Sequence, residues 1–248
     1  MTQSTLELAV RRFTPDGPVS GPPVLLVHGF TSDGESDWLG SGWPAALTAA
    51  GRVVLVPDLP GHGTSPVPRG VADALPSAMV AALLDVVASE SSGPVNVVAY
   101  SLGARLAWEL PKASVTVSHL VLGGISPREP FGALDTEVLL AVAEQGADPG
   151  DPLTGMVASM ITAPGRNTRA LVTCVEGLKA EPFSPSPSDI DVPALFVAGD
   201  ADPVAAGIEE LVELVDGAQL WKVPGDHLST LHGPDFQRVA VDFLTTPR

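Results

Sequence analysis

Short, continuous apolar runs alternate along the chain with longer segments of helical period. The apolar runs lie at 24–27, 53–56, 95–99, 120–122, 194–198 and 220–223. The segments of helical period lie at 43–50, 76–88, 101–110, 205–215 and 236–244. Buried strands that alternate with helices are typical of a parallel sheet with helices on both faces. We therefore expect an α/β fold, a mostly parallel sheet flanked by helices, with an early strand pair within 6–13.

Residues 126–189 break this alternation. Three segments of helical period follow one another with no strand between them, at 134–145, 153–162 and 168–178. A connector rich in proline and serine, 181–188, leads back to the next apolar run. This pattern predicts a small helical cap, 126–189, inserted late in a sheet that is built from 1–125 and 190–248.

The composition suits one large domain with a substantial core. The chain has 248 residues, of which 45% are hydrophobic and 17% are charged. The formal net charge of -16 disfavours nucleic acids and anionic membranes as partners, because both bind cationic surfaces. No apolar stretch reaches the ~20 residues of a membrane span, and the N-terminal residues lack the apolar core of a signal peptide. We expect a cytoplasmic protein with no membrane span.

The residue types offer little to a metal or cofactor. The chain has 1 Cys, Cys174, which excludes an intramolecular disulfide and a cysteine-rich metal site. We therefore expect no cofactor and no metal, and a small-molecule substrate as the partner. The sequence carries no signal for the oligomeric state.

The segment Ala99-Tyr100-Ser101-Leu102-Gly103 follows an apolar strand and opens a helix. This is the context of a nucleophile elbow, in which a serine stands on a sharp strand-to-helix turn between small residues. The first glycine of the G-x-S-x-G pattern is replaced by Ala99, which is also small. The alternative is a serine that caps an ordinary helix. The elbow interpretation predicts that Ser101 is a nucleophile.

Acidic and imidazole groups follow the last two apolar runs. Asp202, beside Pro203, follows one run, and His227 follows the other. Because ligands bind at the carboxyl ends of strands in open α/β sheets, these positions suit a catalytic acid and base. Asp200 is the neighbouring alternative to Asp202, and Asp226 could raise the pKa of His227 or compete for its imidazole. The chain order Ser101, Asp202, His227 matches one known order of the catalytic triad.

Two backbone N–H groups complete the predicted machinery. Leu102 opens the helix after the serine, so its N–H points at a developing oxyanion. Phe30 follows the strand-ending His28-Gly29 turn and supplies a second N–H. We expect these two groups to form an oxyanion hole.

The motifs together resemble the α/β-hydrolase superfamily. The resemblance is carried by "VHGF" at 27–30, "AYSLGA" at 99–104, "GDADP" at 199–203 and "GDH" at 225–227, and by "VPDLPGHGTSP" at 56–66. It implies serine-hydrolase chemistry on a carboxylic ester through an acyl-enzyme. It also implies that the 56–66 loop with His62 is architectural. A serine at the nucleophile position excludes the epoxide and haloalkane chemistries, which need an aspartate.

Candidate substrate contacts are less specific. They are Trp38 and Tyr100, Arg105 just after the serine, and Met156 in the predicted cap. Trp38 is a candidate pocket wall, Met156 has a plain packing role as the alternative, and for Arg105 we favour an ion-pairing role.

Three alternative functions stay open. "YSLGAR" resembles a menaquinone-pathway lyase that releases pyruvate, succinyl-cyclohexadiene-carboxylate synthase, in which the arginine at the position of Arg105 belongs to an anionic-substrate site. That family needs further cap arginines, which Arg128, Arg166 and Arg169 do not match convincingly. Amide, thioester and C–C hydrolysis use the same machinery, and a non-catalytic small-molecule receptor ranks last.

Overall fold

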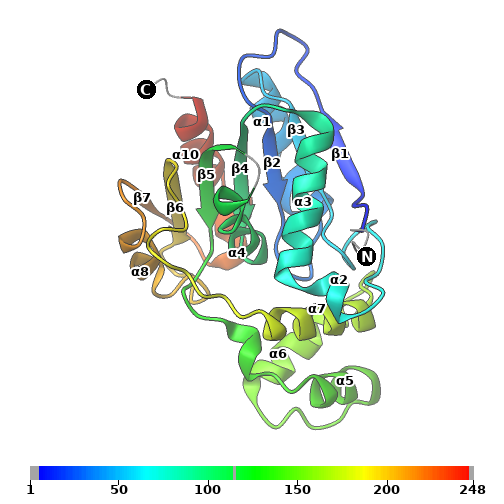
Figure 1. Ribbon diagram of the computed structural model, residues 1–248. Helices are drawn as coiled ribbons and strands as arrows, with labels where there is room; N and C mark the ends of the chain where they lie inside the picture. The colour runs from blue at the N-terminus through cyan, green and yellow to red at the C-terminus, as the bar shows by residue number, and fades with distance from the viewer. Residues whose placement is uncertain (1–5, 114–115, 246–248) are drawn as a thin grey trace.

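A computed structural model of the chain describes residues 6–113 and 116–245. Within these residues a 7-stranded sheet has the order β1-β3-β2-β4-β5-β6-β7 (Figure 1). The strands are β1 (Val10–Phe13), β2 (Val24–Val27), β3 (Val54–Pro57), β4 (Val95–Tyr100), β5 (Val117–Gly123), β6 (Ala194–Gly199) and β7 (Gln219–Val223). Neighbours pair in parallel except β1 and β3, which are antiparallel. The mostly parallel sheet that the apolar runs predict is confirmed.

The early strand pair expected within 6–13 is wrong. That region holds one strand, β1, and its partner is β3, with Val10 opposite Pro57 and Phe13 opposite Val54. Exposure alternates along β1, as on an edge strand, whereas every residue of β2 and β3 is buried. The alternation along β1 is a local signal, but its long-range partner leaves no mark in the segment itself.

Helices cover both faces of the sheet (Figure 1). They are α1 (Trp43–Ala49), α2 (Val71–Ala74), α3 (Pro76–Glu90), α4 (Leu102–Ala107), α8 (Ile208–Glu213), α9 (His227–His232) and α10 (Pro234–Thr245). Trp43 of α1 and Phe236 of α10 belong to the core on one face, and Leu83 of α3 and Leu211 of α8 to the core on the other. Among the described residues, no helix is long and apolar enough to cross a membrane.

Helices alone fill the segment between β5 and β6. They are the short η3 (Pro130–Ala133), α5 (Thr136–Gln145), α6 (Pro152–Ile161) and α7 (Thr168–Ala180). In Figure 1, α5, α6 and α7 gather at one end of the sheet, next to α2. A Cβ at Gly177 would lie 2.0 Å from the Ala74 carbonyl oxygen, so glycine is what lets α7 pack closely against α2.

Two buried histidines hold the 58–66 loop against the end of β2. His28 Nε2 accepts the N–H of Leu59 at 2.8 Å, and His62 Nδ1 donates to the Pro60 carbonyl at 2.9 Å. The two rings lie 5.3 Å apart. Burial, together with the neighbouring His28, lowers the pKa of His62 to about 3. These bonds give the loop the architectural role that the resemblance implies.

Acid should therefore destabilise the fold through His62. The unfolded chain has an ordinary imidazole pKa of 6.5 and takes up the proton first. The contribution of neutral His62 is thus fully present above pH 6.5 and is lost by about 1.4 kcal/mol per pH unit as the pH falls towards 3. We expect His62→Asn to flatten this slope in urea unfolding between pH 6.5 and 4.5, and an unchanged slope would contradict this assignment.

Candidate active site

Ser101 stands on a strained corner between β4 and α4. Its backbone angles are φ 55 and ψ -119, a conformation that non-glycine residues rarely adopt. A Cβ at Gly103 would lie 2.2 Å from the Val27 carbonyl oxygen, so α4 approaches β2 as only a glycine permits. Ala99 is fully buried in β4, between Val27 and Leu122 of the neighbouring strands. The elbow thus forms with alanine at its first small position.

Asp202 and His227 meet beyond the ends of β6 and β7. His227 Nδ1 lies 2.8 Å from Asp202 Oδ2, and the carboxylate has no exposed side-chain surface. Asp202 Oδ1 also accepts the N–H of Val204 at 2.8 Å, which fixes the carboxylate plane. Because a carboxylate accepts only, the bonded Nδ1 carries a proton, and Nε2 of the neutral ring is left as an acceptor.

The two other acidic residues are engaged elsewhere. Asp226 caps α9, where its carboxylate accepts the Ser229 N–H at 2.9 Å. Asp200 accepts the Gly225 N–H at 3.0 Å. Asp202 is therefore the carboxylate that orients His227, and Asp226 does not compete for the imidazole.

Strand β5 brings Ser101 and His227 into one region. The Ser101 N–H donates to the Gly123 carbonyl at 2.9 Å, and the next residue, Gly124, has φ 59. A Cβ at Gly124 would lie 2.8 Å from Cε1 of His227. The Tyr100 hydroxyl, at the end of β4, donates to the His227 backbone carbonyl at 2.8 Å. Residues at or just after the carboxyl ends of the adjacent strands β4, β5, β6 and β7 thus lie close together.

Gly124→Ala should displace the imidazole. The new methyl would meet the Tyr100 ring at 2.7 Å and His227 at 2.8 Å, at a backbone angle that favours glycine. Because misplacing a catalytic group by 1 Å costs about 10²-fold, we expect kcat of any reaction catalysed at this site to fall by about 10²-fold. Gly132→Ala is the matched control, since its Cβ would meet no atom closer than 3.9 Å. An unchanged kcat in Gly124→Ala would contradict this geometry.

The turn after β2 lies against the serine. A Cβ at Gly29 would lie 3.3 Å from the Ser101 Cβ. The Ser32 N–H donates to the Gly29 carbonyl at 3.3 Å, which makes Phe30 and Thr31 the central residues of a tight turn. Leu102 is the first residue of α4, where an N–H has no acceptor within its own helix. Both N–H groups expected to bind an oxyanion thus lie on segments adjoining Ser101.

A buried carboxylate that sequence reasoning missed supports this turn. Asp37 is 3% exposed, and its Oδ2 accepts the Gly29 N–H at 2.9 Å. Its Oδ1 accepts the Ser32 hydroxyl. Asp37 belongs to a short π-helix, η1 (Glu35–Leu39), a rare element found frequently at functional sites. The sequence feature that could have pointed to Asp37 is its place directly before a tryptophan, in the segment that follows the turn.

Three of the candidate substrate contacts lie in surroundings that do not indicate substrate binding. Trp38 has no exposed surface and packs edge-on against Trp43, 5.1 Å between ring centroids, so it contacts no open pocket. Tyr100 is 1% exposed and supports His227 from within the core. Met156 is 55% exposed on α6 and joins no cluster around Ser101. Packing accounts for Trp38 and Tyr100, and Met156 has no contact that points to substrate.

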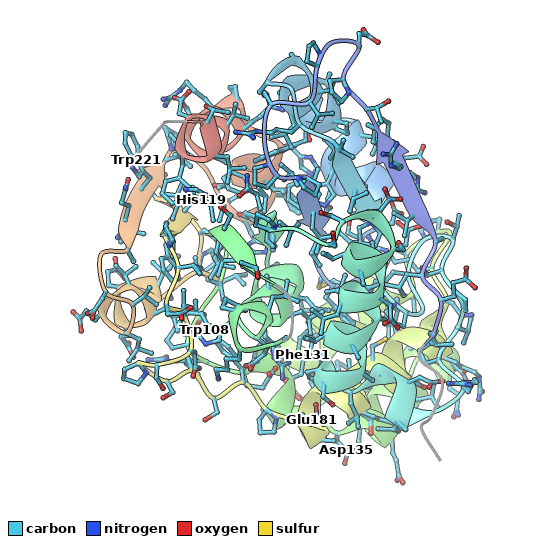
Figure 2. All side chains as sticks on the ribbon, turned by 45° about the horizontal axis from the view of Figure 1, so that its top comes forward. Trp108, His119, Phe131, Asp135, Glu181 and Trp221 are labelled. Carbon is cyan, nitrogen blue, oxygen red and sulfur yellow. The ribbon has the colours of Figure 1, made fainter. Side chains whose placement is uncertain are left out.

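Arg105 ties the helical segment to α4. Its guanidinium pairs with Glu129 at 2.5 Å, where the segment leaves the sheet, and donates to the Glu181 carbonyl at 2.5 Å, where the segment returns. Phe183 follows and packs edge-on against Trp108, with 5.6 Å between the ring centroids. Figure 2 labels Trp108 and Glu181. Arg105 is 7% exposed. Its bonds match the ion-pairing role favoured from the sequence, although its Nε has no hydrogen-bond partner among the described residues.

Arg105→Met should destabilise the protein strongly. The substitution leaves the Glu129 carboxylate, 10% exposed, without its cation. Breaking a buried pair on one side costs about 3–5 kcal/mol. Arg169→Met is the control, because Arg169 pairs with Glu144 while 73% exposed, and such pairs contribute about 0–1 kcal/mol. Urea unfolding measures both, and equal losses would contradict the bracing role.

Cys174 is not a second nucleophile. It is fully buried on α7, and burial raises the pKa of its thiol to about 12. Its Sγ donates to the Pro60 carbonyl at 3.4 Å, which links α7 to the 58–66 loop. Across the residues that the structure describes, no group of three His, Cys, Asp or Glu is placed to hold a metal ion.

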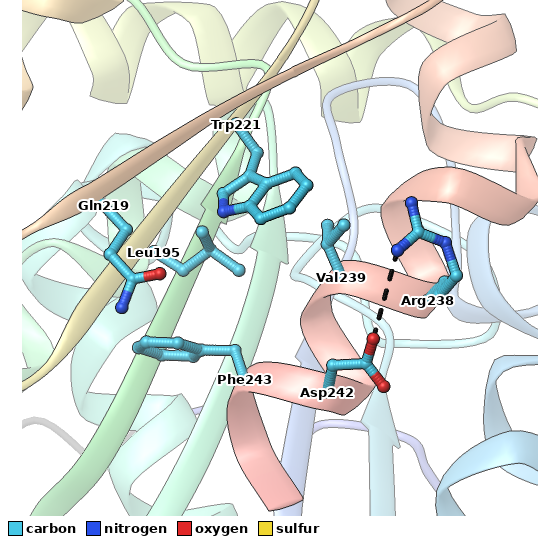
Figure 3. A pocket seen from close by; sticks show the side chains of 7 residues that line it. All are labelled: Leu195, Gln219, Trp221, Arg238, Val239, Asp242 and Phe243. Carbon is cyan, nitrogen blue, oxygen red and sulfur yellow. Dashed lines mark ion pairs between the residues drawn. The ribbon is translucent and has the colours of Figure 1, made fainter. Parts of the chain in front are cut away.

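One surface pocket lies away from this site. It measures about 330 Å³ between β6, β7 and α10, and Trp221, Leu195 and Phe243 are among its lining residues (Figure 3). Leu195 and Gln219 stand at the amino ends of their strands. Asp202 and His227 follow the opposite ends, so the pocket is not part of the candidate active site.

Comparison with known proteins finds similarity over nearly the whole chain. A model of the alpha/beta hydrolase family matches residues 24–240. The chain is 32% identical over 222 residues to Lipase LipV of Mycobacterium tuberculosis (strain ATCC 25618 / H37Rv), which covers 88% of this chain and 67% of that protein.

Two solved structures share the fold. The enol-lactonase from Burkholderia xenovorans LB400 has a TM-score of 0.75 at 22% identity and covers 96% of each chain. A thermophilic esterase from Thermogutta terrifontis also has a TM-score of 0.75 at 22% identity, over 96% of this chain and 93% of that one.

Proposed function

Because the chain belongs to the alpha/beta hydrolase family, we propose that it is a serine hydrolase that cleaves small or medium carboxylic esters through an acyl-enzyme. The observations that carry this are the Asp202–His227 pair and a serine held at φ 55, which both lie at the Gly123–Gly124 end of β5. A strained serine and an imidazole oriented by a carboxylate are the parts that nucleophilic acyl transfer needs.

The proposed mechanism follows from the hydrogen bonds. His227 Nε2, left as an acceptor by the bond to Asp202, takes the proton of Ser101 as Oγ attacks the ester carbonyl. The N–H groups of Phe30 and Leu102 bind the oxyanion of the tetrahedral intermediate. His227 then gives the proton to the leaving alcohol, and the acyl group stays on Ser101. Water repeats these steps and releases the acid.

Two observations favour an uncharged ester. The names lipase and esterase belong to a sequence relative and to a structural neighbour. Arg105, the position that would bind an anionic substrate in the lyase family, is held by Glu129 and by the 178–181 backbone. These contacts favour the ion-pairing role of Arg105 over the lyase function.

We further propose that 126–189 acts as a cap that shapes the ester pocket. Phe131, from η3 of this segment and labelled in Figure 2, packs edge-on against Phe30, with 4.9 Å between the ring centroids. A side chain of the segment thus contacts the residue whose N–H is assigned to the oxyanion hole. Aromatic groups at this position favour apolar over charged acyl or alcohol groups.

A chain-length series tests the function. We expect the wild type to hydrolyse p-nitrophenyl acetate, butyrate and octanoate at pH 7–8, with one chain length preferred at least severalfold in kcat/KM. Phe131→Ala should shift that preference towards longer chains, whereas Phe183→Ala, on the far side of the segment, should not. Absence of turnover on all three esters would contradict the proposal.

A further inference from the structure

We infer that Asp37 is a positioning residue. Its carboxylate binds both ends of the turn after β2, called the oxyanion turn below, and so sets the direction of the Phe30 N–H. This inference rests on the proposed function. It concerns a carboxylate that lies outside the triad and that serves neither as nucleophile nor as base.

The clamp holds both ends of one turn. Gly29 and Ser32 are the first and last residues of the turn whose central residues are Phe30 and Thr31. Asp37 Oδ2 accepts the Gly29 N–H at 2.9 Å, while Oδ1 accepts the Ser32 hydroxyl. A carboxylate carries two diverging acceptor oxygens, so one side chain can bind both ends at once.

The turn needs such a restraint because it is strained. Thr31 has φ 62 and is 6% exposed. A β-branched residue in this region is an outlier that persists only where the surroundings over-determine it. If the clamp is released, the turn can relax, and relaxation of Thr31 reorients the peptide groups on either side, including the Phe30–Thr31 unit.

Asp37 itself is rigidly placed. Its π-helix is anchored by Trp38, which is fully buried against Trp43. The Asp37 backbone also donates to the Asp33 carbonyl at 3.0 Å and accepts the Ser41 hydroxyl at 3.0 Å. Trp38 thus acts through Asp37, on the oxyanion turn.

The clamp also selects which N–H is available. Because the Gly29 N–H is taken by Asp37, that donor is withdrawn from the oxyanion. The Gly29 Cα stays close enough to Ser101 that an added Cβ would lie 3.3 Å from the Ser101 Cβ. The next donor along the turn, on Phe30, is the one that the relaxed turn would misdirect.

The test combines four variants. Asp37→Ala removes both bonds, and we expect kcat for p-nitrophenyl acetate to fall by about 10²-fold with KM little changed. Asp37→Asn keeps one acceptor for Gly29 and offers an N–H to the Ser32 oxygen, so kcat should stay within about fivefold of wild type. Thr31→Gly in the Asp37→Ala background should recover about tenfold, since glycine adopts positive φ freely. Glu35→Ala, which removes an exposed carboxylate from the same π-helix, is the matched control.

Two readouts separate positioning from folding. Phenylboronic acid forms a tetrahedral adduct with a nucleophilic serine, so its Ki should rise in Asp37→Ala by about the factor that kcat falls. A fluorophosphonate that labels Ser101 should react more slowly but to the same final fraction. A reduced labelled fraction at an unchanged rate would mean lost folding only and would overturn the inference, as would a kcat and Ki matching those of Glu35→Ala. If Asp37→Ala does not fold, Ser32→Ala, which removes one arm, must still lower the labelling rate.

The outcomes distinguish this inference from the proposed function. If the wild type is labelled at Ser101 but cleaves no ester, the proposed function is wrong, and the labelling rates of the variants still decide the role of Asp37. If the wild type is not labelled at all, the turn serves no nucleophile, and the inference falls with the function.

Discussion

Replacing Ser101 by alanine is expected to lower kcat/KM for p-nitrophenyl acetate by at least about 10⁴-fold, the largest effect we predict. The substitution removes the nucleophile, and losing the serine of a Ser-His-Asp triad leaves only the catalysis of the oxyanion hole and of binding. The backbone should be preserved, because the Ser101 N–H that donates to the Gly123 carbonyl at 2.9 Å is a backbone group, and alanine has the same group.

Ser126→Ala is the control for this substitution. Ser126 lies just after β5, the strand next to Ser101, and its hydroxyl donates to the Ala206 carbonyl at 3.0 Å. It faces the adjoining loop, so its removal should leave kcat within about twofold, an effect below that of one hydrogen bond. Ester hydrolysis is followed by the absorbance of the released p-nitrophenolate. Residual activity in Ser101→Ala near the wild-type level would remove Ser101 from the mechanism.

Asp202→Asn is expected to lower kcat by about 10⁴-fold, the second largest effect. An amide beside His227 Nδ1 can present a donor instead of an acceptor, and the imidazole then carries its proton on Nε2. In that tautomer it cannot take the proton of Ser101. The buried carboxylate oxygen at 2.8 Å from Nδ1 is therefore required for the tautomer as well as for the orientation.

Asp200→Asn and Asp226→Asn test the specificity of this role. Asp200 accepts the Gly225 N–H and Asp226 caps α9, so neither carboxylate faces the imidazole ring of His227. Both variants should keep kcat within about fivefold, since each changes one local hydrogen bond. A drop in Asp200→Asn as large as in Asp202→Asn would show that the carboxylate has been misassigned.

Local patterns explain why the sheet could be predicted from the sequence. Strands buried on both faces, such as 24–27 and 95–99, need apolar residues at every position, and this requirement is visible without knowing the neighbours. The elbow is equally local, because the need for small residues on both sides of Ser101 arises within five positions. Even so, the order of the strands follows from long-range pairing, which is why β1 was not placed beside β3.

The supporting shell of the site could not be predicted in the same way. Trp38 as a pocket wall and Trp38 as an anchor for the π-helix need the same residue type, and only its contact with Trp43 decides between them. Tyr100 reaches the His227 carbonyl across 127 positions of sequence. Arg105 finds its acceptor in Glu181, 76 positions away. These contacts depend on the folded geometry and leave no periodic signal.

Asp37 is the clearest case of this limit. In the sequence it is one of 29 acidic residues, and most acids are exposed. Only its burial at 3% exposure and its bonds to both ends of one turn set it apart. The candidate triad residues could therefore be proposed from residue type and chain order, whereas the residues that position them could not.

The central claim is that Ser101 carries the acyl group, and trapping that intermediate tests it most directly. Wild-type protein is mixed rapidly with excess p-nitrophenyl acetate, quenched in acid within the first turnover, and digested for peptide mass spectrometry. We predict an acetyl group on the peptide that contains Ser101, accumulating with the burst of p-nitrophenolate and absent in Ser101→Ala. An acetyl group on another residue, or turnover of the ester without any acetylated peptide, would contradict the account.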